Sequence, residues 1–263
     1  MKISVVTVAY NAADTISDTL ESVAAQNHDS IEHIVIDGAS SDETMRVVDG
    51  YRNSLAQVVS EPDDGIYHAM NKGIALTTGD VIGTLNADDM YMHDGVMKRV
   101  AEAFEDPSVE ACYGDLIYVD RDRLDKTIRY WTSRDYRPGL FERGWLPAHP
   151  TFFVRREVYE KHGLFDLKYN IQSDFELTMR FLALRKINSM YIPEILIRMR
   201  MGGTTNNSVM NFIKGNLESY RACKSHGLRI SPLFFVTKWA QRLPQFVRRP
   251  SANKLRSFHV SAR

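Results

Sequence analysis

Two adjacent carboxylates follow a short apolar run in residues 85–89, LNADD. A buried strand that ends in Asp88 and Asp89 places charge where it is costly unless a positive group compensates it. Mg²⁺ or Mn²⁺ is such a group, since these ions take one or two carboxylates and let substrate phosphates complete their coordination. We therefore expect Asp88 and Asp89 to bind a divalent cation that carries a diphosphate.

Polar side chains also follow three earlier apolar runs. They are Tyr10 and Asn11 after the first run, Asp37 after the second, and Glu61, Asp63 and Asp64 after the third. Each of them alone is an ordinary cap or turn residue. Because ligands of parallel sheets bind at the carboxyl ends of the strands, the whole set predicts a carboxylate-lined crevice.

Alternating strand and helix patterns connect these polar residues. Strand-type apolar runs occur at residues 3–10, 31–38, 56–62 and 79–85, and helical patterns occur at 14–26, 65–79 and 94–105. Ser40 and Glu43 stand at capping-box spacing before one further helix. This succession predicts an α/β fold with a mostly parallel central sheet flanked by helices.

Composition and missing motifs disfavour several classes of protein. The 263 residues are 44% hydrophobic and 25% charged, which is ordinary for a globular chain. No Gly-x-Gly-x-x-Gly follows the first strand, and no Gly-x-x-x-x-Gly-Lys-Ser/Thr is present, which disfavours dinucleotide oxidoreductases and P-loop nucleotidases. Cys112 and Cys223 match no metal-ligand spacing and are expected to be thiols in a reducing compartment. The first residues do not read as an export signal, so we expect a cytoplasmic protein.

Taken together, the motifs resemble those of family-two glycosyltransferases of the GT-A fold, which are inverting enzymes that use nucleotide-diphosphate sugars. The matching segments cover roughly residues 2–200 and are SVVTVAYNA, IDGASSDET, SEPDDGIYHAMNKGIA, LNADD, HPTFFVRREVYEKHGLFD and QSDFEL. The third segment is similar to bacterial members that assemble surface polysaccharides. The resemblance implies a metal-dependent transferase that moves a sugar from a nucleotide-diphosphate donor, with a UDP-sugar favoured, to a glycan or lipid-linked acceptor.

The resemblance also implies a division of the chain. A GT-A catalytic domain is expected at residues 1–205, with a nucleotide-binding half at about 1–115 and an acceptor half at about 116–205. A helical, basic C-terminal extension is expected at 206–263. Residues 198–208, RMRMGGTTNNS, predict either a mobile loop that closes over the donor or an ordinary linker.

Most of the crevice residues are assigned to the nucleotide sugar. The residues expected to bind it are Thr7, Ala9, Tyr10, Asn11, Asp37, Glu61, Asp64, Lys72, Asn86, Ala87 and His149. Tyr10 is expected to flank the base, and Asp37 to accept a hydrogen bond from it. Lys72 could equally be a solvated helical lysine, and His149 could equally be a structural hydrogen-bonding residue.

The segment Asn86-Ala87-Asp88 stands where the family has Asp-x-Asp. In the family the first position usually faces the ribose, and the last binds the metal. Asn86 can hydrogen-bond a hydroxyl but brings no charge. Metal binding must therefore rest on Asp88, with help from Asp89.

Residues 172–176, QSDFE, match the family's catalytic acidic motif. The resemblance implies that Asp174 is the general base, which takes the proton of the acceptor hydroxyl as the nucleotide diphosphate leaves from the opposite face. The alternative is a residue at a helix N-terminus stabilised by the helix dipole, since FELTMRFLALRK follows in helical period. Glu176 faces elsewhere on that helix and is not expected to share the role.

Charge is distributed unevenly along the chain. The net charge is zero, yet no acidic residue follows Glu218, while ten basic residues do. Interleaved with Phe and Trp, these charges predict contact with an anionic membrane surface, so that the enzyme is peripheral at the inner face. A basic, unstructured terminus is the alternative. The acidic body would repel phosphates, so no nucleic-acid partner is expected.

Two other function classes stay open at this point. Because Asn86 lacks a charge, the chain could be a non-catalytic module that binds a nucleotide sugar or a glycan with the same fold. Nucleotidyltransferases have a similar carboxylate crevice. Donor turnover with and without metal separates the first class from a transferase, and release of pyrophosphate would indicate the second.

Overall fold

The computed structural model of the chain describes residues 1–202, 209–247 and 249–250. Its strands are β1 (Ile3–Ala9), β2 (Ile31–Asp37), β3 (Gln57–Ser60), β4 (Val81–Asn86), β5 (Asp89–Tyr91), β6 (Ala111–Val119), β7 (Thr127–Trp131), β8 (Phe153–Arg155) and β9 (Ser189–Arg200). Its helices are α1 (Ile16–Ala24), α2 (Thr44–Asp49), α3 (Ile66–Leu76), α4 (Val96–Ala103), α5 (Arg156–His162), α6 (Ser173–Met179), α7 (Val209–Ser225), α8 (Phe234–Ala240) and α9 (Pro244–Val247). Most of the predicted mobile loop, residues 203–208, and the end of the tail lie outside the described residues.

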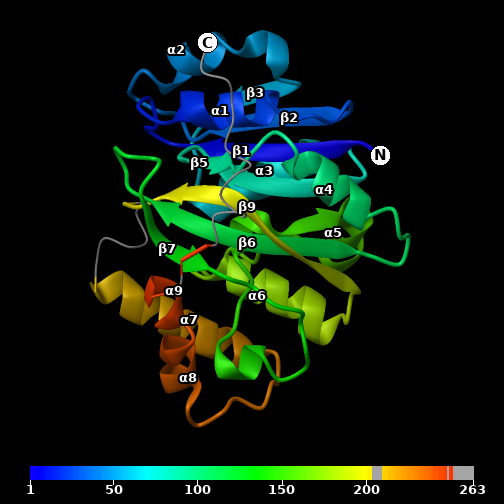
Figure 1. Cartoon of the computed structure of the whole chain (residues 1–263), viewed down its shortest axis with the longest axis vertical. Coiled ribbons are helices and arrows are strands. Elements are labelled where there is room, and N and C mark those ends of the chain that lie inside the picture. Colours follow the sequence, from blue (N-terminus) through cyan, green and yellow to red (C-terminus); the bar gives the residue numbers. More distant parts are fainter. Residues whose placement is uncertain (203–208, 248, 251–263) are drawn as a thin grey trace.

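The strands of the described residues form one sheet in the order β3-β2-β1-β4-β8-β6-β9-β5, with β7 also paired to β6 (Figure 1). The neighbours β3, β2, β1 and β4 are parallel, as are β6 and β9. In contrast, β8 is antiparallel to β4 and β6, and β5 is antiparallel to β9. The predicted α/β fold is confirmed; the sheet is mixed, and its parallel half is the part that the strand and helix repeats predicted.

Helices cover both faces of the parallel half of the sheet. Val6 and Val8 of β1 share a core with α3, α5 and α6. Ile3 and Val5, which point to the other face, share a core with α4. Because alternate side chains of a strand point to opposite faces, β1 must be apolar on both sides, and this explains its continuous run ISVVTVA.

Helix α3 lies very close to β1 at a glycine. A Cβ atom at Gly73 would lie 2.1 Å from Val6 Cγ1 and 3.1 Å from Ile36 Cγ1, so only a residue without a side chain fits. One and a half turns earlier, the ring of Tyr67 stacks on Phe165 with 5.3 Å between the ring centroids. The close approach therefore fixes where the start of α3 meets the loop before α6.

The C-terminal helices lie at the end of the molecule opposite to β3 and α2 (Figure 1). Phe234 of α8 is fully buried and belongs to the core that α3 and α6 share. Within the described ranges, no helix is long and apolar enough to cross a membrane. Because α7 and α8 both contribute to this core, they pack on the same side of the sheet as α6.

Candidate active site

The loop after β1 is tied to the loop after β2. Asn11 has a positive φ of 48°, a conformation that asparagine adopts more readily than most residues. Its backbone N–H donates to Ser40 Oγ at 2.8 Å, and its side-chain Oδ1 accepts the Ser41 N–H at 2.9 Å. Tyr10 is left 68% exposed beside this junction, and Ala9 is buried. Tyr10 thus has the free ring face that flanking a base requires.

Thr7 lies inside the sheet instead of at the crevice. It is fully buried, and its hydroxyl is 2.8 Å from Nε2 of His33 on β2. Burial lowers the pKa of His33 to about 3, so the pair is neutral at physiological pH. A nucleotide contact through the Thr7 side chain, expected from the sequence, does not fit this geometry.

Asp37 is a buried carboxylate held by serines. It accepts hydrogen bonds from the Ser40 backbone N–H at 3.0 Å, from the Ser40 hydroxyl, and from Ser60 Oγ at 2.6 Å. The predicted capping box of Ser40 and Glu43 is wrong, because α2 begins at Thr44 and Ser40 bonds Asp37. The carboxylate of Asp42 accepts the Thr44 N–H instead, at 3.0 Å.

Lys72 of α3 bridges two acids that follow β3. Its ammonium lies 2.8 Å from Glu61 and 2.7 Å from Asp63. Burial alone would lower the pKa of Lys72, but the Asp63 and Glu61 carboxylates raise it above its ordinary value. Asp64 points away, with 95% of its side chain exposed. No binding role was expected of Asp63 from the sequence. Its side chain is nevertheless buried at the crevice, whereas that of Asp64 is exposed to solvent.

Two polar residues at and just after the end of β4 each leave a buried oxygen without a partner. Asn86 donates from Nδ2 to Asp89 Oδ2 at 3.2 Å, but Asn86 Oδ1 and Asp89 Oδ1 have no hydrogen-bond partner in the described part of the chain. Burial raises the pKa of Asp88. Burial, followed by the charge of Asp88, raises the pKa of Asp89 well above its ordinary value. Ala87 between them is buried, and its carbonyl accepts a hydrogen bond from Thr15 at 2.9 Å.

Unpartnered oxygens beside two carboxylates suit a divalent cation. Among the described residues, no group of three His, Cys, Asp or Glu side chains is arranged to hold a metal ion. An ion here would be held by Asp88 and Asp89 with the Asn86 amide, and the remaining ligands would come from a diphosphate and water. This arrangement fits Mg²⁺ or Mn²⁺, which keep open positions for substrate phosphates.

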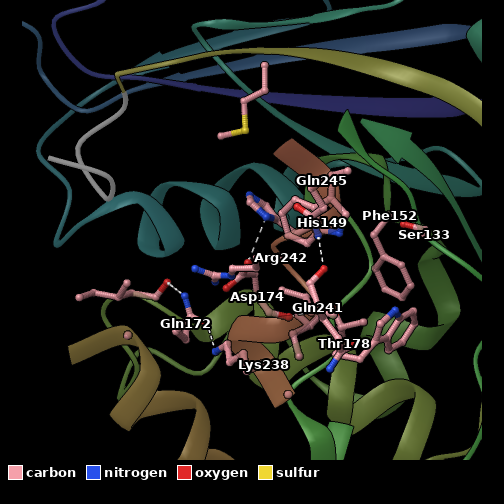
Figure 2. Close-up of a pocket in the computed structure, with 18 of the residues that line it drawn as sticks. Ser133, His149, Phe152, Gln172, Asp174, Thr178, Lys238, Gln241, Arg242 and Gln245 are labelled. Carbon is pink, nitrogen blue, oxygen red and sulfur yellow. Dashed lines mark hydrogen bonds and ion pairs between the residues drawn. The ribbon is translucent and has the colours of Figure 1, made fainter. Parts of the chain in front are cut away.

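A pocket of about 570 Å³ extends from Asn86 to Asp174. Asp174 is 7% exposed, and Nδ1 of His149 lies 3.2 Å from its Oδ2 (Figure 2). The Tyr67 hydroxyl lies 3.1 Å from Asp174 Oδ1 and 2.9 Å from the Ile171 carbonyl, and its single proton bonds one of them at a time. Burial and the Asp174 charge raise the pKa of Tyr67 well above its ordinary value, so it stays a hydrogen-bond donor.

The contacts of Asp174 argue against a capping role. Gln172 precedes the first turn of α6, and no side chain caps that turn. Glu176 on the same helix is 1% exposed and forms separate ion pairs, with Arg180 and His226 at 2.9 Å each. Asp174 therefore faces the pocket, while Glu176 ties α6 to His226 directly after α7, as the helical spacing predicted.

Sequence reasoning missed several pocket residues. Tyr67 stands inside the quoted segment SEPDDGIYHAMNKGIA, which was a usable signal. Lys238 and Arg242 belong to the basic tail, yet both line the pocket (Figure 2). Phe234, Lys238 and Arg242 follow one another at intervals of four residues, which places them on one face of a helix. This interval was the only indication in the sequence that they face the interior.

Comparisons with known proteins identify the family and the fold of the chain. The model of the family Glycosyl transferase family 2 matches residues 4–163. An uncharacterized glycosyltransferase of Mycobacterium tuberculosis is 34% identical over 180 residues, which cover 68% of each chain. A PGL/p-HBAD biosynthesis glycosyltransferase of Mycobacterium bovis is 26% identical over 213 residues, covering 79% of this chain and 80% of that relative.

Solved structures share the fold. S. aureus TarS 1–349 in complex with UDP matches with a TM-score of 0.62 at 17% identity, over 87% of this chain and 67% of that chain. The mannosyltransferase PcManGT from Pyrobaculum calidifontis, in complex with GDP-Man and Mn²⁺, matches with a TM-score of 0.63 at 19% identity, over 92% and 69%. At these identities the likeness concerns the fold alone, which is the predicted GT-A fold. With a family model that spans more than half of its length, the chain belongs to glycosyl transferase family 2 and is a glycosyltransferase.

Proposed function

We propose that this glycosyltransferase moves a sugar, with inversion, from a nucleotide-diphosphate donor to a hydroxyl of a glycan or lipid-linked acceptor. The observation that carries the proposal is the Asp174 carboxylate, buried and oriented by Tyr67 and His149 in a pocket that reaches Asn86. A UDP-sugar is the favoured donor, and the solved structures with UDP and with GDP-Man support the nucleotide-sugar class.

The chemistry then follows from the positions of the groups. The acceptor oxygen attacks the anomeric carbon, the bond from that carbon to the diphosphate oxygen breaks, and the acceptor proton passes to Asp174. Tyr67 and His149 hold the two carboxylate oxygens of Asp174 in place, which keeps the base oriented toward the pocket. A divalent cation at Asp88 and Asp89, when bound, supplies charge neutralisation for the leaving diphosphate.

The donor would lie along the carboxyl ends of β1, β2 and β4. Tyr10 flanks the base, and Asp37 accepts a hydrogen bond from it with its serine-held carboxylate. Lys72 is engaged by Glu61 and Asp63, so in this proposal it shapes the wall of the crevice instead of binding phosphate directly. The nucleotide half is residues 1–115, the acceptor half 116–205 and the extension 206–263.

One observation favours a second candidate, a non-catalytic module that binds a nucleotide sugar. Asn86 replaces the first acid of the metal-binding segment and leaves one charge fewer for the ion. The two functions differ in turnover. A transferase releases nucleoside diphosphate from the donor, slowly with water and faster with an acceptor, whereas a binding module releases none.

Metal-dependent donor binding tests the proposal. Asp88→Asn should weaken binding of UDP in Mn²⁺ at least about tenfold, because it removes a charge-assisted contact to the ion. Asp125→Asn is the matched control, since Asp125 is an exposed acid of the β6–β7 turn. Calorimetry with Mn²⁺ and with EDTA measures both variants. Equal UDP affinity in Mn²⁺ and in EDTA would contradict the metal assignment.

A further inference from the structure

The pocket beside Asp174 has a positively charged wall. Arg129 of β7, Lys238 of α8 and Arg242 in the turn after α8 all line it, and Figure 2 shows Lys238 and Arg242 there. In the described part of the chain, no carboxylate lies within ion-pair distance of these three side chains. Burial lowers the pKa values of both Lys238 and Arg242 overall, although the charge of the nearby Asp174 carboxylate raises them.

Among the described residues, Arg242 has fewer hydrogen-bond partners than the other two cations. Within the described ranges, no acceptor atom lies at hydrogen-bonding distance from its side chain. Its one cation–π contact there is with the Phe212 ring, whose centre lies 5.5 Å from the guanidinium carbon. Burial lowers the pKa of Arg242, yet an arginine in this range stays charged. A half-buried cation without an anion is costly, so a ligand that supplies the anion is expected to be favoured.

Arg129 is held rigidly in the same wall. Its Nε donates to Gln245 Oε1 at 2.7 Å, and its guanidinium carbon lies 4.7 Å from the centre of the Tyr118 ring and 5.2 Å from that of Phe246. Gln245 follows α8 in the chain, so the C-terminal segment itself orients this arginine. Burial and the neighbouring Arg242 charge lower the pKa of Arg129. Both guanidinium groups belong to residues that line the same pocket.

Lys238 adds a third, deeper cation. Its Nζ lies 2.6 Å from Ser219 Oγ and 3.4 Å from Gln172 Oε1, and the side chain is 5% exposed. A Cβ atom at Gly144 would lie 2.5 Å from Lys238 Cβ, so the glycine lets α8 approach this closely. Burial, together with Arg242, lowers the pKa of Lys238 to about 7. A bound anion would favour the charged form.

We propose that Arg129, Lys238 and Arg242 form an anion subsite that binds a phosphate ester group of the acceptor while Asp174 takes the proton of the acceptor hydroxyl. The inference rests on the proposed function, and it adds the chemical class of the acceptor. Three cations match a multiply charged phosphate or diphosphate better than a single carboxylate. Guanidinium groups bind phosphate through paired N–H donors, which fixes its orientation.

Two probes test the subsite without a sugar donor. Calorimetry in EDTA, which removes any metal-bridged binding at Asp88, would measure the affinity for farnesyl diphosphate and for inorganic diphosphate. Arg242→Gln should weaken binding about tenfold to a hundredfold, because it removes charge-assisted hydrogen bonds to the phosphate. Lys224→Gln is the matched control, since it removes one charge from an exposed position of the same C-terminal segment. Arg129→Gln is the second variant, in case Arg242→Gln does not fold.

The results separate the sources of the phosphate. Binding of farnesyl diphosphate alone, lost in Arg242→Gln, supports a lipid-linked phosphate, and binding of both probes supports recognition of the phosphate group itself. No binding of either probe, or equal affinity in wild type, Arg242→Gln and Lys224→Gln, overturns the subsite. UDP binding in Mn²⁺ is measured on the same samples. If UDP binds and the diphosphates do not, only the subsite fails; if wild type does not bind UDP, the proposed function fails.

Discussion

The position of one carboxylate decides what the pocket can do. Asp174 sits at the start of α6, but its two oxygens are turned to Tyr67 and His149 instead of to the helix backbone. A cap would satisfy orphan backbone N–H groups. A base needs an oriented carboxylate beside open space, and the pocket supplies that space.

Asp174→Asn separates binding from chemistry. The amide keeps the size of the carboxylate and can still hydrogen-bond Tyr67, but it cannot accept the acceptor's proton. We expect kcat to fall about a hundredfold or more, while the Kd for UDP in Mn²⁺ changes little. Single-turnover transfer and UDP calorimetry measure the two effects. Transfer at the wild-type rate would mean that another residue is the base.

Residues within quoted motifs could be predicted, but residues that reach the site from distant segments could not. Asp88 and Asp89 were singled out because they follow a buried apolar run, and Asp174 because its segment resembles the family's catalytic acidic motif. Arg242 lines the same pocket as Asp174 only because the segment around α8 folds back onto that pocket, and no local pattern encodes this arrangement. Thr7 is the opposite case, since a polar residue in a strand faces either the core or the crevice, and its bond to His33 decides for the core.

At the scale of elements, one buried acid joins three segments at the amino-terminal ends of the parallel strands. Glu32 of β2 is 8% exposed and accepts hydrogen bonds from Lys2 Nζ at 2.6 Å, from Ser4 Oγ at 2.6 Å and from the Thr78 N–H at 2.7 Å. Burial alone would raise the pKa of Glu32, but these contacts outweigh it and lower the pKa to about 2. The native structure therefore stabilises the ionised form of Glu32.

Glu32→Gln should remove a pH-dependent part of the stability. An acid whose folded pKa lies below its unfolded value of 4.5 stabilises the fold above that value and loses this effect as pH falls toward 2. The free energy of unfolding should drop by up to about 3 kcal/mol at pH 7, and the difference from wild type should shrink as the pH falls from 5 to about 2. Urea unfolding across this range measures it. A difference that does not depend on pH would show that the carboxylate charge is not responsible.

The parallel half of the sheet was readable because its strands are short, mostly apolar runs that alternate with helical patterns. The antiparallel strands β5 and β8 have three residues each, too few to establish a period, and long-range pairing alone defines them. The helix predicted after Asp174 ends at Met179 and continues as a wider π turn over Arg180–Leu184. There Arg180 donates to the carbonyls of His162 and Leu164, contacts that only the tertiary fold provides.

At the scale of the whole molecule, the basic tail divides into an inner and an outer face. Lys238 and Arg242 face the pocket, so their charge does not serve an outer surface. On the outer face of α8, Val236 and Trp239 are 63% and 57% exposed. Arg248, Lys254, Phe258 and the rest of the terminus, to which the membrane prediction also applied, lie outside the described residues.

The outer face of α8 leads to a prediction about anionic membranes. If the acceptor is lipid-linked, the exposed apolar side chains of α8, together with exposed basic residues of the tail such as Arg229 and Arg249, should hold the enzyme at the surface reversibly. Binding to anionic liposomes should then weaken as salt rises, since charges are screened over a Debye length of about 8 Å at physiological ionic strength. Cosedimentation measures this, with neutral liposomes as the comparison.

Point substitutions test that prediction better than removal of the tail, because α8 also supplies Phe234 to the core and a truncated chain would lose stability. The double variant Val236→Ser with Trp239→Ser should sediment less with anionic liposomes and keep the UDP affinity of the wild type. Leu167→Ser, which changes a side chain of 48% exposure far from α8 in sequence, is the control and should bind liposomes as the wild type does. If the full-length wild type ignores anionic liposomes at low salt, α8 does not dock on a membrane. A soluble phosphorylated glycan would then be the acceptor that fits the positive wall of the pocket.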